Sequence, residues 1–221
     1  MESFVAADSE YRDAVKAVGA KLPAAFKSAR NVAINLDGSD LTNAILLRLR
    51  AFYESQCAIT KKLQKDKAAP AADFFVETMA FFLTVALEKI APDLQVKSEK
   101  VVKSGKSHLR PDISVFRGAE LIAVIECKVQ LGYSRNTWQE EFCKRTDSFT
   151  EINRNIAVFL LVSTEQNWHG FDPSDERVGT QWFAILDKTT TAREFEMGRD
   201  VRCITHRVEQ LVAQIRDIPR Q

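Results

Sequence analysis

The chain has 221 residues, enough for one substantial hydrophobic core with a helical extension but hardly for two full domains. Its apolar fraction of 45%, charged fraction of 28% and net charge of +1 are those of an ordinary globular protein and argue against a globally basic nucleic-acid coat. No apolar run is long enough to span a bilayer, and the first residues do not have the pattern of a secretory signal peptide. The four cysteines lack paired zinc-ligand spacing. We therefore expect a cytoplasmic protein with reduced thiols and no membrane partner.

Two helices are expected in the N-terminal part of the chain. From Asp8 to Ala29, apolar residues recur at helical spacing with charges between them, which predicts an amphipathic helix. Residues 31–36 alternate weakly and can form either a short strand or an extended connector. Residues 38–40 then supply a turn and an N-cap for a second helix, which runs to about Gln64.

A linker at residues 65–70 is the best internal boundary. It separates an N-terminal helical extension, residues 1–69, from a core, residues 70–221. The apolar stripes of the N-terminal helices can pack on this core or join two copies of the chain in a dimer.

A third helix opens the core, from about Ala71 to Ile90. It is apolar around most of its circumference, which predicts a heavily packed position. Its narrow polar stripe includes Glu77. The segment from Leu94 to Val102 then predicts a strand, followed by a turn at residues 104–106.

Two further strands carry charged residues among apolar ones. They run from Arg110 to Phe116 and from Leu121 to Val129, joined by a short hairpin connection. Glu126 and Lys128 emerge on the same face of the second strand, about 6.7 Å apart. Asp112, directly after a proline, supplies a second carboxylate from the first strand. Charges in such strands are costly unless they are paired, neutralised or bound to a metal.

The rest of the chain alternates helices and strands. A loop at residues 131–136 leads to a helix from about Thr137 to Ile152, and Ile156 to Val162 is a continuous apolar run typical of a strand covered on both faces. A strand, helix and strand in this order form a right-handed crossover, so this strand should lie parallel to the Glu126 strand. A last strand at residues 181–186 and a C-terminal helix follow. The order predicts an α/β fold, with a mixed central β-sheet flanked by helices and an N-terminal helical extension.

Pro111-Asp112 and Glu126-x-Lys128, on two adjacent strands, resemble the motif of the PD-(D/E)xK nuclease superfamily, the restriction-endonuclease-like phosphodiesterases. The resemblance covers roughly residues 71–163. The predicted order also matches the common unit of that superfamily, which runs helix, three strands, helix, strand. The resemblance implies a restriction-endonuclease-like core that hydrolyses phosphodiester bonds with Mg²⁺ or Mn²⁺, held by Asp112 and Glu126.

The resemblance also implies roles for neighbouring residues. The backbone carbonyl of Cys127 would face the same metal, and Lys128 would orient or help deprotonate the attacking water and offset charge on the phosphate. Glu77 matches a helical position that often completes the metal site, although it can equally belong to a solvent-facing stripe. A structural Glu–Lys pair at the edge of the sheet is the alternative interpretation, but it leaves the third charge unexplained. The expected catalytic residues are therefore Asp112, Glu126, Lys128 and Glu77.

Basic residues around the motif strands are candidates for contacts with DNA phosphates. The segment from Lys97 to Arg110 carries five basic residues against one acidic residue, so phosphate tracking and a plain solvated face are equally good interpretations. A second basic cluster, at residues 61–67, is interpreted as a solvent-exposed face. The expected phosphate contacts are Lys103, Lys106, Arg110 and Arg135.

The leading hypothesis is a metal-dependent DNA nuclease that cuts internally, of the restriction or defence type. One alternative keeps the fold without catalysis, as a DNA-binding or assembly module. Another makes the nuclease an effector, controlled by a partner or ligand that the N-terminal helices sense. The charged trio favours catalysis, because a scaffold has no need of it.

Overall fold

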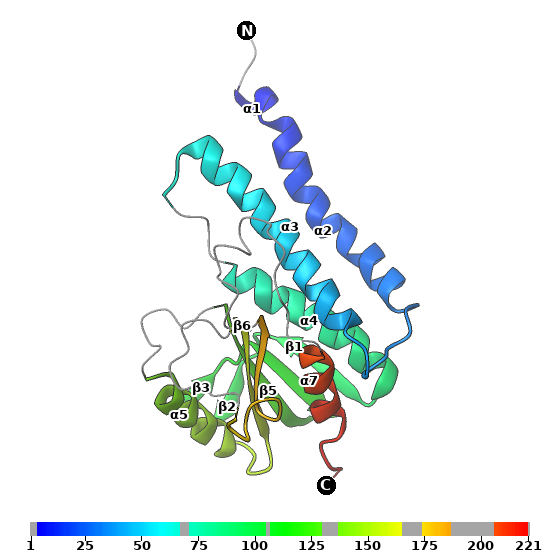
Figure 1. The fold of residues 1–221 in the computed structure, drawn as a ribbon, viewed down its shortest axis with the longest axis vertical. Coiled ribbons are helices and arrows are strands. Elements are labelled where there is room, and N and C mark those ends of the chain that lie inside the picture. Colours follow the sequence, from blue (N-terminus) through cyan, green and yellow to red (C-terminus); the bar gives the residue numbers. More distant parts are fainter. Residues whose placement is uncertain are drawn as a thin grey trace. The chain divides into compact units, whose positions relative to one another are not determined.

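The chain divides into two compact units, Met1–Ile34 and Asn35–Gln221. The first unit contains α1 (Phe4–Ala7) and α2 (Ser9–Ala29), where the amphipathic helix was expected. Residues 31–36 form turns and a connector and no strand. The computed structural model (Figure 1) describes residues 4–66, 71–104, 107–129, 137–164, 174–186 and 206–220.

The helix α3 (Asp40–Leu63) belongs to the second unit. It packs against α4 (Ala72–Ile90) and α7 (Arg207–Arg216), and its Ile45 and Leu49 side chains are buried. The two compact units therefore divide after residue 34. The expected boundary between residues 69 and 70 stays a prediction, although α3, which precedes it, shares its apolar face with the core.

Buried hydrogen bonds fasten the first turn of α3 to the first turn of α7. The Thr42 backbone N–H and hydroxyl donate to the fully buried Glu209 carboxylate at 3.1 and 2.6 Å. The Val208 N–H donates in turn to the Thr42 hydroxyl at 3.2 Å. The carboxylate thus satisfies one free N–H group at the N-terminus of α3, where negative charge is favoured.

The second unit is built on a five-stranded sheet with strand order β1-β4-β5-β6-β7. β1, β4 and β5 pair antiparallel, whereas β5, β6 and β7 pair parallel, as predicted for the strand after the crossover helix. The sheet is therefore mixed. The strands are β1 (Leu94–Ser98), β4 (Ile113–Arg117), β5 (Glu120–Lys128), β6 (Ala157–Thr164) and β7 (Trp182–Leu186).

One predicted strand is divided in two. β1 ends at Ser98, and Glu99 has a φ of 48°, in the left-handed region, which turns the chain out of the sheet. The following β2 (Val102–Ser104) and β3 (Ser107–Leu109) pair antiparallel in a separate ribbon on either side of the expected turn.

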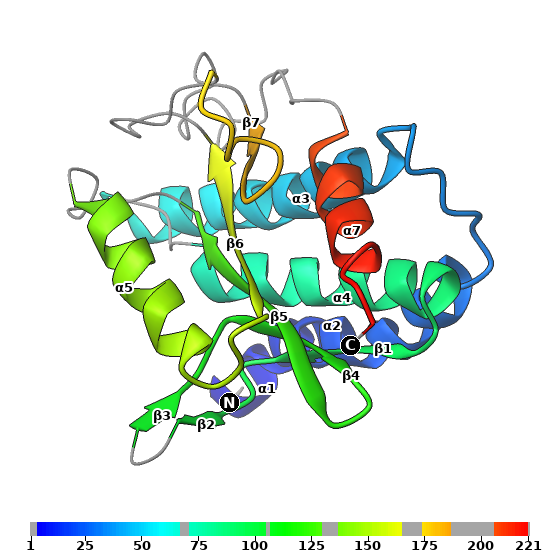
Figure 2. The same ribbon diagram turned by 90° about the horizontal axis from the view of Figure 1, so that it is seen from below.

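Helices cover both faces of the sheet (Figure 2). On one face lies α5 (Trp138–Thr150), and on the other lie α4 and α7. Because side chains alternate along a strand, Val124 and Glu126 of β5 share the α5 face. The buried cluster on this face contains Val124, Trp138, Phe142, Phe149, Val158, Leu160 and Val162. The α/β fold predicted from the sequence is confirmed.

Candidate active site

Asp112 and Glu126 meet where β4 begins and β5 ends. Ile113 pairs with Ile125, so the two acids are opposite each other one residue beyond this pair. The Cys127 backbone N–H donates a 2.7 Å hydrogen bond to Asp112 Oδ2. This bond holds the Asp112 carboxylate against the end of β5.

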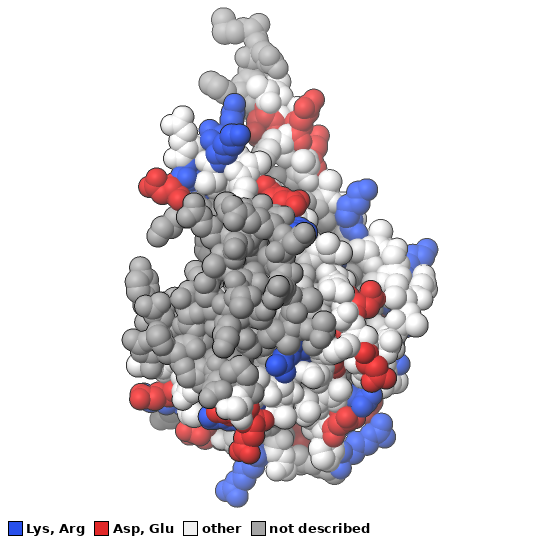
Figure 3. Space-filling model, viewed as in Figure 1, with Lys and Arg blue, Asp and Glu red and all other residues white. Residues whose placement is uncertain are grey.

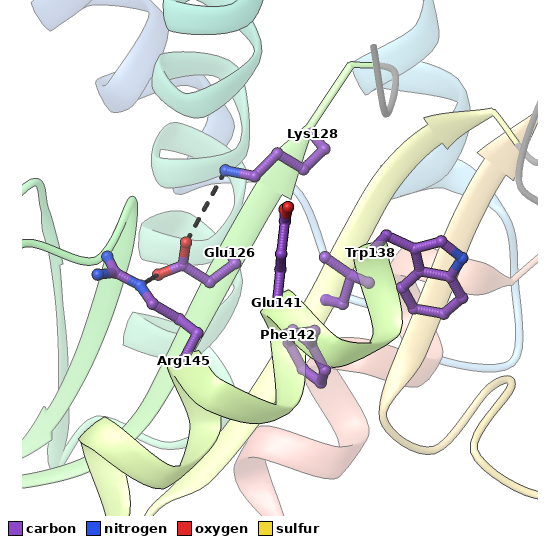
Figure 4. Close-up of a pocket in the computed structure, with 7 residues that line it drawn as sticks. Glu126, Lys128, Trp138, Glu141, Phe142 and Arg145 are labelled. Carbon is purple, nitrogen blue, oxygen red and sulfur yellow. Dashed lines mark hydrogen bonds and ion pairs between the residues drawn. The ribbon is translucent and has the colours of Figure 1, made fainter. Parts of the chain in front are cut away.

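Lys128 lies between the two carboxylates. Its Nζ is 3.4 Å from Asp112 Oδ2 and 3.8 Å from Glu126 Oε2. Figure 4 shows the lysine side chain reaching back along β5 toward Glu126. The structure therefore brings together the three residues at the centre of the sequence motif.

A fourth charged group, not expected from the sequence, reaches this cluster from α5. Arg145 places Nε 3.2 Å from Glu126 Oε1, and its Nη2 donates a 2.9 Å bond to the Arg110 carbonyl. Its guanidinium also lies 5.0 Å from the centre of the Phe149 ring. The signal was present in the sequence: Arg145 falls on the apolar stripe of α5, between Phe142 and Phe149, where a charge needs a partner.

Burial dominates the electrostatics of Glu126, which is 6% exposed. Burial raises the pKa of its carboxyl and the charge of Asp112 raises it further, while Arg145 and Lys128 oppose both effects. The net result is a raised pKa. Burial, with Asp112, likewise raises the pKa of the Cys127 thiol well above its usual value. The Cys127 side chain is thus a neutral thiol, and its proposed metal contact through the backbone carbonyl stays a prediction.

A pocket of about 180 Å³ opens beside the cluster. Figure 4 shows Glu126 and Arg145 on one side of it and Trp138 on the other, with Glu141 between them. The pocket therefore joins an apolar wall to a row of charges. Its lining residues are Glu126, Lys128, Trp138, Glu141, Phe142, Arg145 and Leu160.

The structure does not bring Glu77 into the cluster. Glu77 is exposed on α4, and no hydrogen bond or ion pair among the described residues joins it to the motif residues. In the same part of the chain, no group of three or more His, Cys, Asp and Glu residues could hold a metal ion. A ligand role for Glu77 stays a prediction, and the acids that converge are Asp112 and Glu126.

The donor set of these two acids fits a hard divalent cation. Mg²⁺ typically binds one or two carboxylates and completes its shell with waters and phosphate oxygens. The charge of Asp112 also disfavours the charged form of Glu126 and so contributes to its raised pKa. A cation between them would relieve this repulsion, as Lys128 and Arg145 do in part.

The residues expected to contact DNA are only partly described. Arg110 is exposed and forms an ion pair with Glu99 at 3.1 Å. Lys103 lies in β2, where its backbone alone is described. Lys106 and Arg135 lie outside the described residues.

Two other lysines of the basic segment lie together on the sheet. The Nζ atoms of Lys97 and Lys100 are 5.0 and 4.3 Å from the centre of the Phe116 ring. Desolvation and the neighbouring Lys97 lower the pKa of Lys100. Such a pair of cations suits an anion bound between them. In Figure 3, the visible acidic and basic side chains are interspersed, so basic character is local.

No protein-family model matches the chain, and no curated protein matches it. Among solved structures, the chain is similar to part of a refined half-complex from a tetradecameric assembly of Thermococcus gammatolerans McrB AAA+ hexamers with bound McrC. The identity is 15%, the TM-score is 0.30, and the match covers 55% of this chain and 31% of that chain. Similarity at this level supports no conclusion about this protein. Among the described residues, no helix is both long enough and apolar enough to cross a membrane.

Proposed function

We propose that the protein is a metal-dependent nuclease that hydrolyses DNA phosphodiester bonds and cuts internally. The observation that carries the proposal is the convergence of Asp112, Glu126 and Lys128 at one end of the β4–β5 pair. A structural ion pair needs one acid and one base. Here two acids from adjacent strands share one lysine, in the pattern that resembles the PD-(D/E)xK motif.

Asp112 and Glu126 are the residues that would hold Mg²⁺ or Mn²⁺, with Cys127 and Glu77 as the further ligands implied by the resemblance. When bound, the metal would polarise the phosphate and lower the pKa of a water molecule. The Cys127 N–H already fixes Asp112, so this carboxylate needs little rearrangement to accept a cation.

Lys128 and Arg145 supply the positive charge that phosphodiester hydrolysis requires. The water oxygen forms a bond to phosphorus, the bond from phosphorus to the leaving sugar oxygen breaks, and that oxygen takes up a proton. Lys128, as an ammonium, orients the water and offsets the charge that builds up on the phosphate. Arg145 is free to turn toward the phosphate once a cation replaces it at Glu126.

DNA is the proposed partner, bound through the basic segment that precedes Asp112. Lys97 and Lys100, together with Lys103, Lys106, Arg110 and Arg135, would contact backbone phosphates without reading sequence. Two copies joined through their N-terminal helices would bring two sites to one duplex. A cytoplasmic location accords with the free thiols of Cys57, Cys127 and Cys143.

A catalytically inactive DNA-binding or assembly module is the second candidate. The observation in its favour is that Lys128 and Arg145 both form ion pairs with Glu126, so the chain's own residues compensate this carboxylate. A charge cluster satisfied in this way can serve the fold alone.

Cleavage of supercoiled plasmid in Mg²⁺ or Mn²⁺ separates the two candidates. We expect nicked and linear products from the unaltered protein, and a loss of at least about 100-fold in rate for Glu126→Gln and for Lys128→Ala. Excess EDTA should also abolish cleavage. Glu140→Gln is the matched control, because Glu140 is exposed on the first turn of α5. Binding of DNA without cleavage by the unaltered protein would favour the module.

A further inference from the structure

The helix α2 is 21 residues long and contains no buried residue. Four of its large apolar side chains, Tyr11, Val15, Val18 and Leu22, are 61%, 58%, 71% and 45% exposed, whereas Phe26, one turn further along, is half-buried. The four exposed side chains follow one another at intervals of four, three and four residues, so they form one continuous stripe along the helix. Helices in proteins gain most of their stability by burying such a face, so this stripe requires a partner surface.

The stripe has the same spacing when it is read from either end. If a second copy of α2 lies antiparallel to the first with Val15 opposite Val18, then Tyr11 falls opposite Leu22. Each large apolar side chain of the stripe then meets an apolar side chain of the other copy. The stripe is therefore complementary to itself under a two-fold axis.

Among the described residues, three charged side chains of α2 form no ion pair: Glu10, Lys21 and, away from the stripe, Lys27. Arg12 pairs with Asp8, and Lys16 lies 3.3 Å from its acidic partner Asp13. Glu10 and Lys21 are eleven positions apart, about three turns, so they flank the same edge of the apolar stripe.

The charges of Glu10 and Lys21 favour an antiparallel over a parallel pair of α2 helices. In the antiparallel arrangement, Glu10 of one copy lies beside Lys21 of the other, and the contact occurs twice by symmetry. A parallel arrangement in register would bring like charges together at both places. The antiparallel arrangement also opposes the two helix dipoles.

We propose that α2 is a self-association element, through which two copies of the chain join as an antiparallel helix pair. Tyr11 and Leu22 pack across the interface, Val15 and Val18 form its centre, and Glu10 pairs with Lys21 twice along one edge. The proposal is independent of the nuclease proposal, because α2 contains none of the candidate active-site residues.

The oligomeric state of the full chain in solution tests the proposal. Sedimentation equilibrium should give a mass of twice the 25.0 kDa of one chain, with dissociation on dilution. Val18→Lys places a charge at the centre of the interface in each copy, and we expect it to raise the dissociation constant at least about 100-fold. Thermal unfolding of the variant should still show the folded second unit, which contains none of the substituted positions. Ala20→Lys, on the opposite side of α2 from the stripe, is the matched control.

Charge reversal tests the direction of the pair. Glu10→Lys or Lys21→Glu alone sets like charges beside each other twice, which should raise the dissociation constant by about tenfold, and the double variant should restore it. A monomer at all concentrations would overturn the proposal and assign the stripe to a surface of its own chain. A dimer that Val18→Lys leaves intact, or a double variant weaker than both single variants, would also overturn it. Plasmid cleavage reports on the nuclease separately.

Discussion

At Glu126, the carboxylate that the proposed reaction needs lies in surroundings that disfavour its charge. The apolar wall of the pocket and the nearby Asp112 both favour the protonated form, and two cations oppose them. Perturbed acids of this kind gather at functional sites, because a metal or a substrate is meant to complete the charge balance. In the proposed reaction, Glu126 would therefore be held ready for a metal ion at some expense in stability.

Glu126→Gln should make the metal-free protein relatively more stable as the pH rises. A raised pKa means that the protonated carboxyl stabilises the fold fully below the ordinary glutamate pKa, and that this contribution is lost as the pH rises through the raised value. The glutamine stays neutral throughout. Thermal unfolding in EDTA at pH 4, 6 and 8 measures this effect. The unfolding temperature of the variant should rise relative to that of the parent as the pH increases. A difference that does not change with pH would contradict this account.

Arg145→Met should strengthen metal binding while it weakens cleavage. The guanidinium competes with a cation for Glu126, so its removal should tighten Mn²⁺ binding by about fivefold, or about 1 kcal/mol. Isothermal titration with Mn²⁺ measures the first effect, and plasmid cleavage measures the second. The control is Arg154→Met, since Arg154 is exposed in the turn after α5. Weaker Mn²⁺ binding in Arg145→Met would show that the arginine supports the site in another way.

At the scale of the elements, the contact between α3 and α7 explains why α3 belongs to the core. Glu209 is fully buried, and it accepts two hydrogen bonds from Thr42 at the start of α3. A buried carboxylate that loses these donors remains unsatisfied, which is costly. The two helices therefore depend on each other although they are far apart in the sequence.

Thr42→Val keeps the shape of the side chain but removes the hydroxyl between Glu209 and the Val208 N–H. We expect a loss of about 2–3 kcal/mol in the free energy of unfolding, measured by urea denaturation. Thr42→Ser, which keeps the hydroxyl, should lose less than about 1 kcal/mol. A larger loss for Thr42→Ser than for Thr42→Val would show that the methyl group matters more than the hydroxyl and its hydrogen bonds.

The elements differ in how well local sequence predicts them. The charged residues of β5 were recognisable because they interrupt an apolar strand, and β6 was recognisable as a continuous apolar run. The pairing of Thr42 with Glu209 was not predictable, because it depends on how α7 docks on α3. Arg145 lies between these cases: its position on an apolar stripe signals a buried partner but does not identify Glu126.

At the scale of the whole molecule, positive and negative charges nearly cancel, but they are unevenly distributed. The net charge is +1, yet Lys97 and Lys100 lie close together over one ring at the edge of the sheet. If DNA binds through this pair of lysines, its affinity should fall as the salt concentration rises. The steepness of that fall depends on the number of phosphates contacted.

Lys100→Gln should therefore reduce the salt dependence of DNA binding. Each lost phosphate contact lowers the slope of log K against log salt concentration by about one. Fluorescence anisotropy with a labelled duplex over a range of KCl concentrations gives this slope. Lys62→Gln, in the cluster on α3 that reads as a solvated face, should leave it unchanged. A smaller slope for Lys62→Gln with an unchanged slope for Lys100→Gln would instead indicate that DNA binds on α3.

The architecture was predictable because it rests on periodicity and order. Helical and strand patterns, together with the handedness of crossovers, lead to the mixed sheet and to the parallel β5–β6 pair. The separation of β2 and β3 from the sheet was not predictable, because it depends on the left-handed backbone of Glu99, a residue type that rarely adopts it. The division of the chain after residue 34 depends on which surface α3 covers, and amphipathicity alone does not specify that surface.

The bond between Thr42 and Glu209 has a consequence for synthesis on the ribosome. The two residues are 167 positions apart, so the first turn of α3 must wait for most of the protein to be translated before its buried acceptor exists. Until then the nascent chain holds α3 and the sheet without the helix that joins them. A chaperone that shields the apolar face of α3 during this interval would prevent premature aggregation, and a truncated product lacking α7 would remain open to proteases.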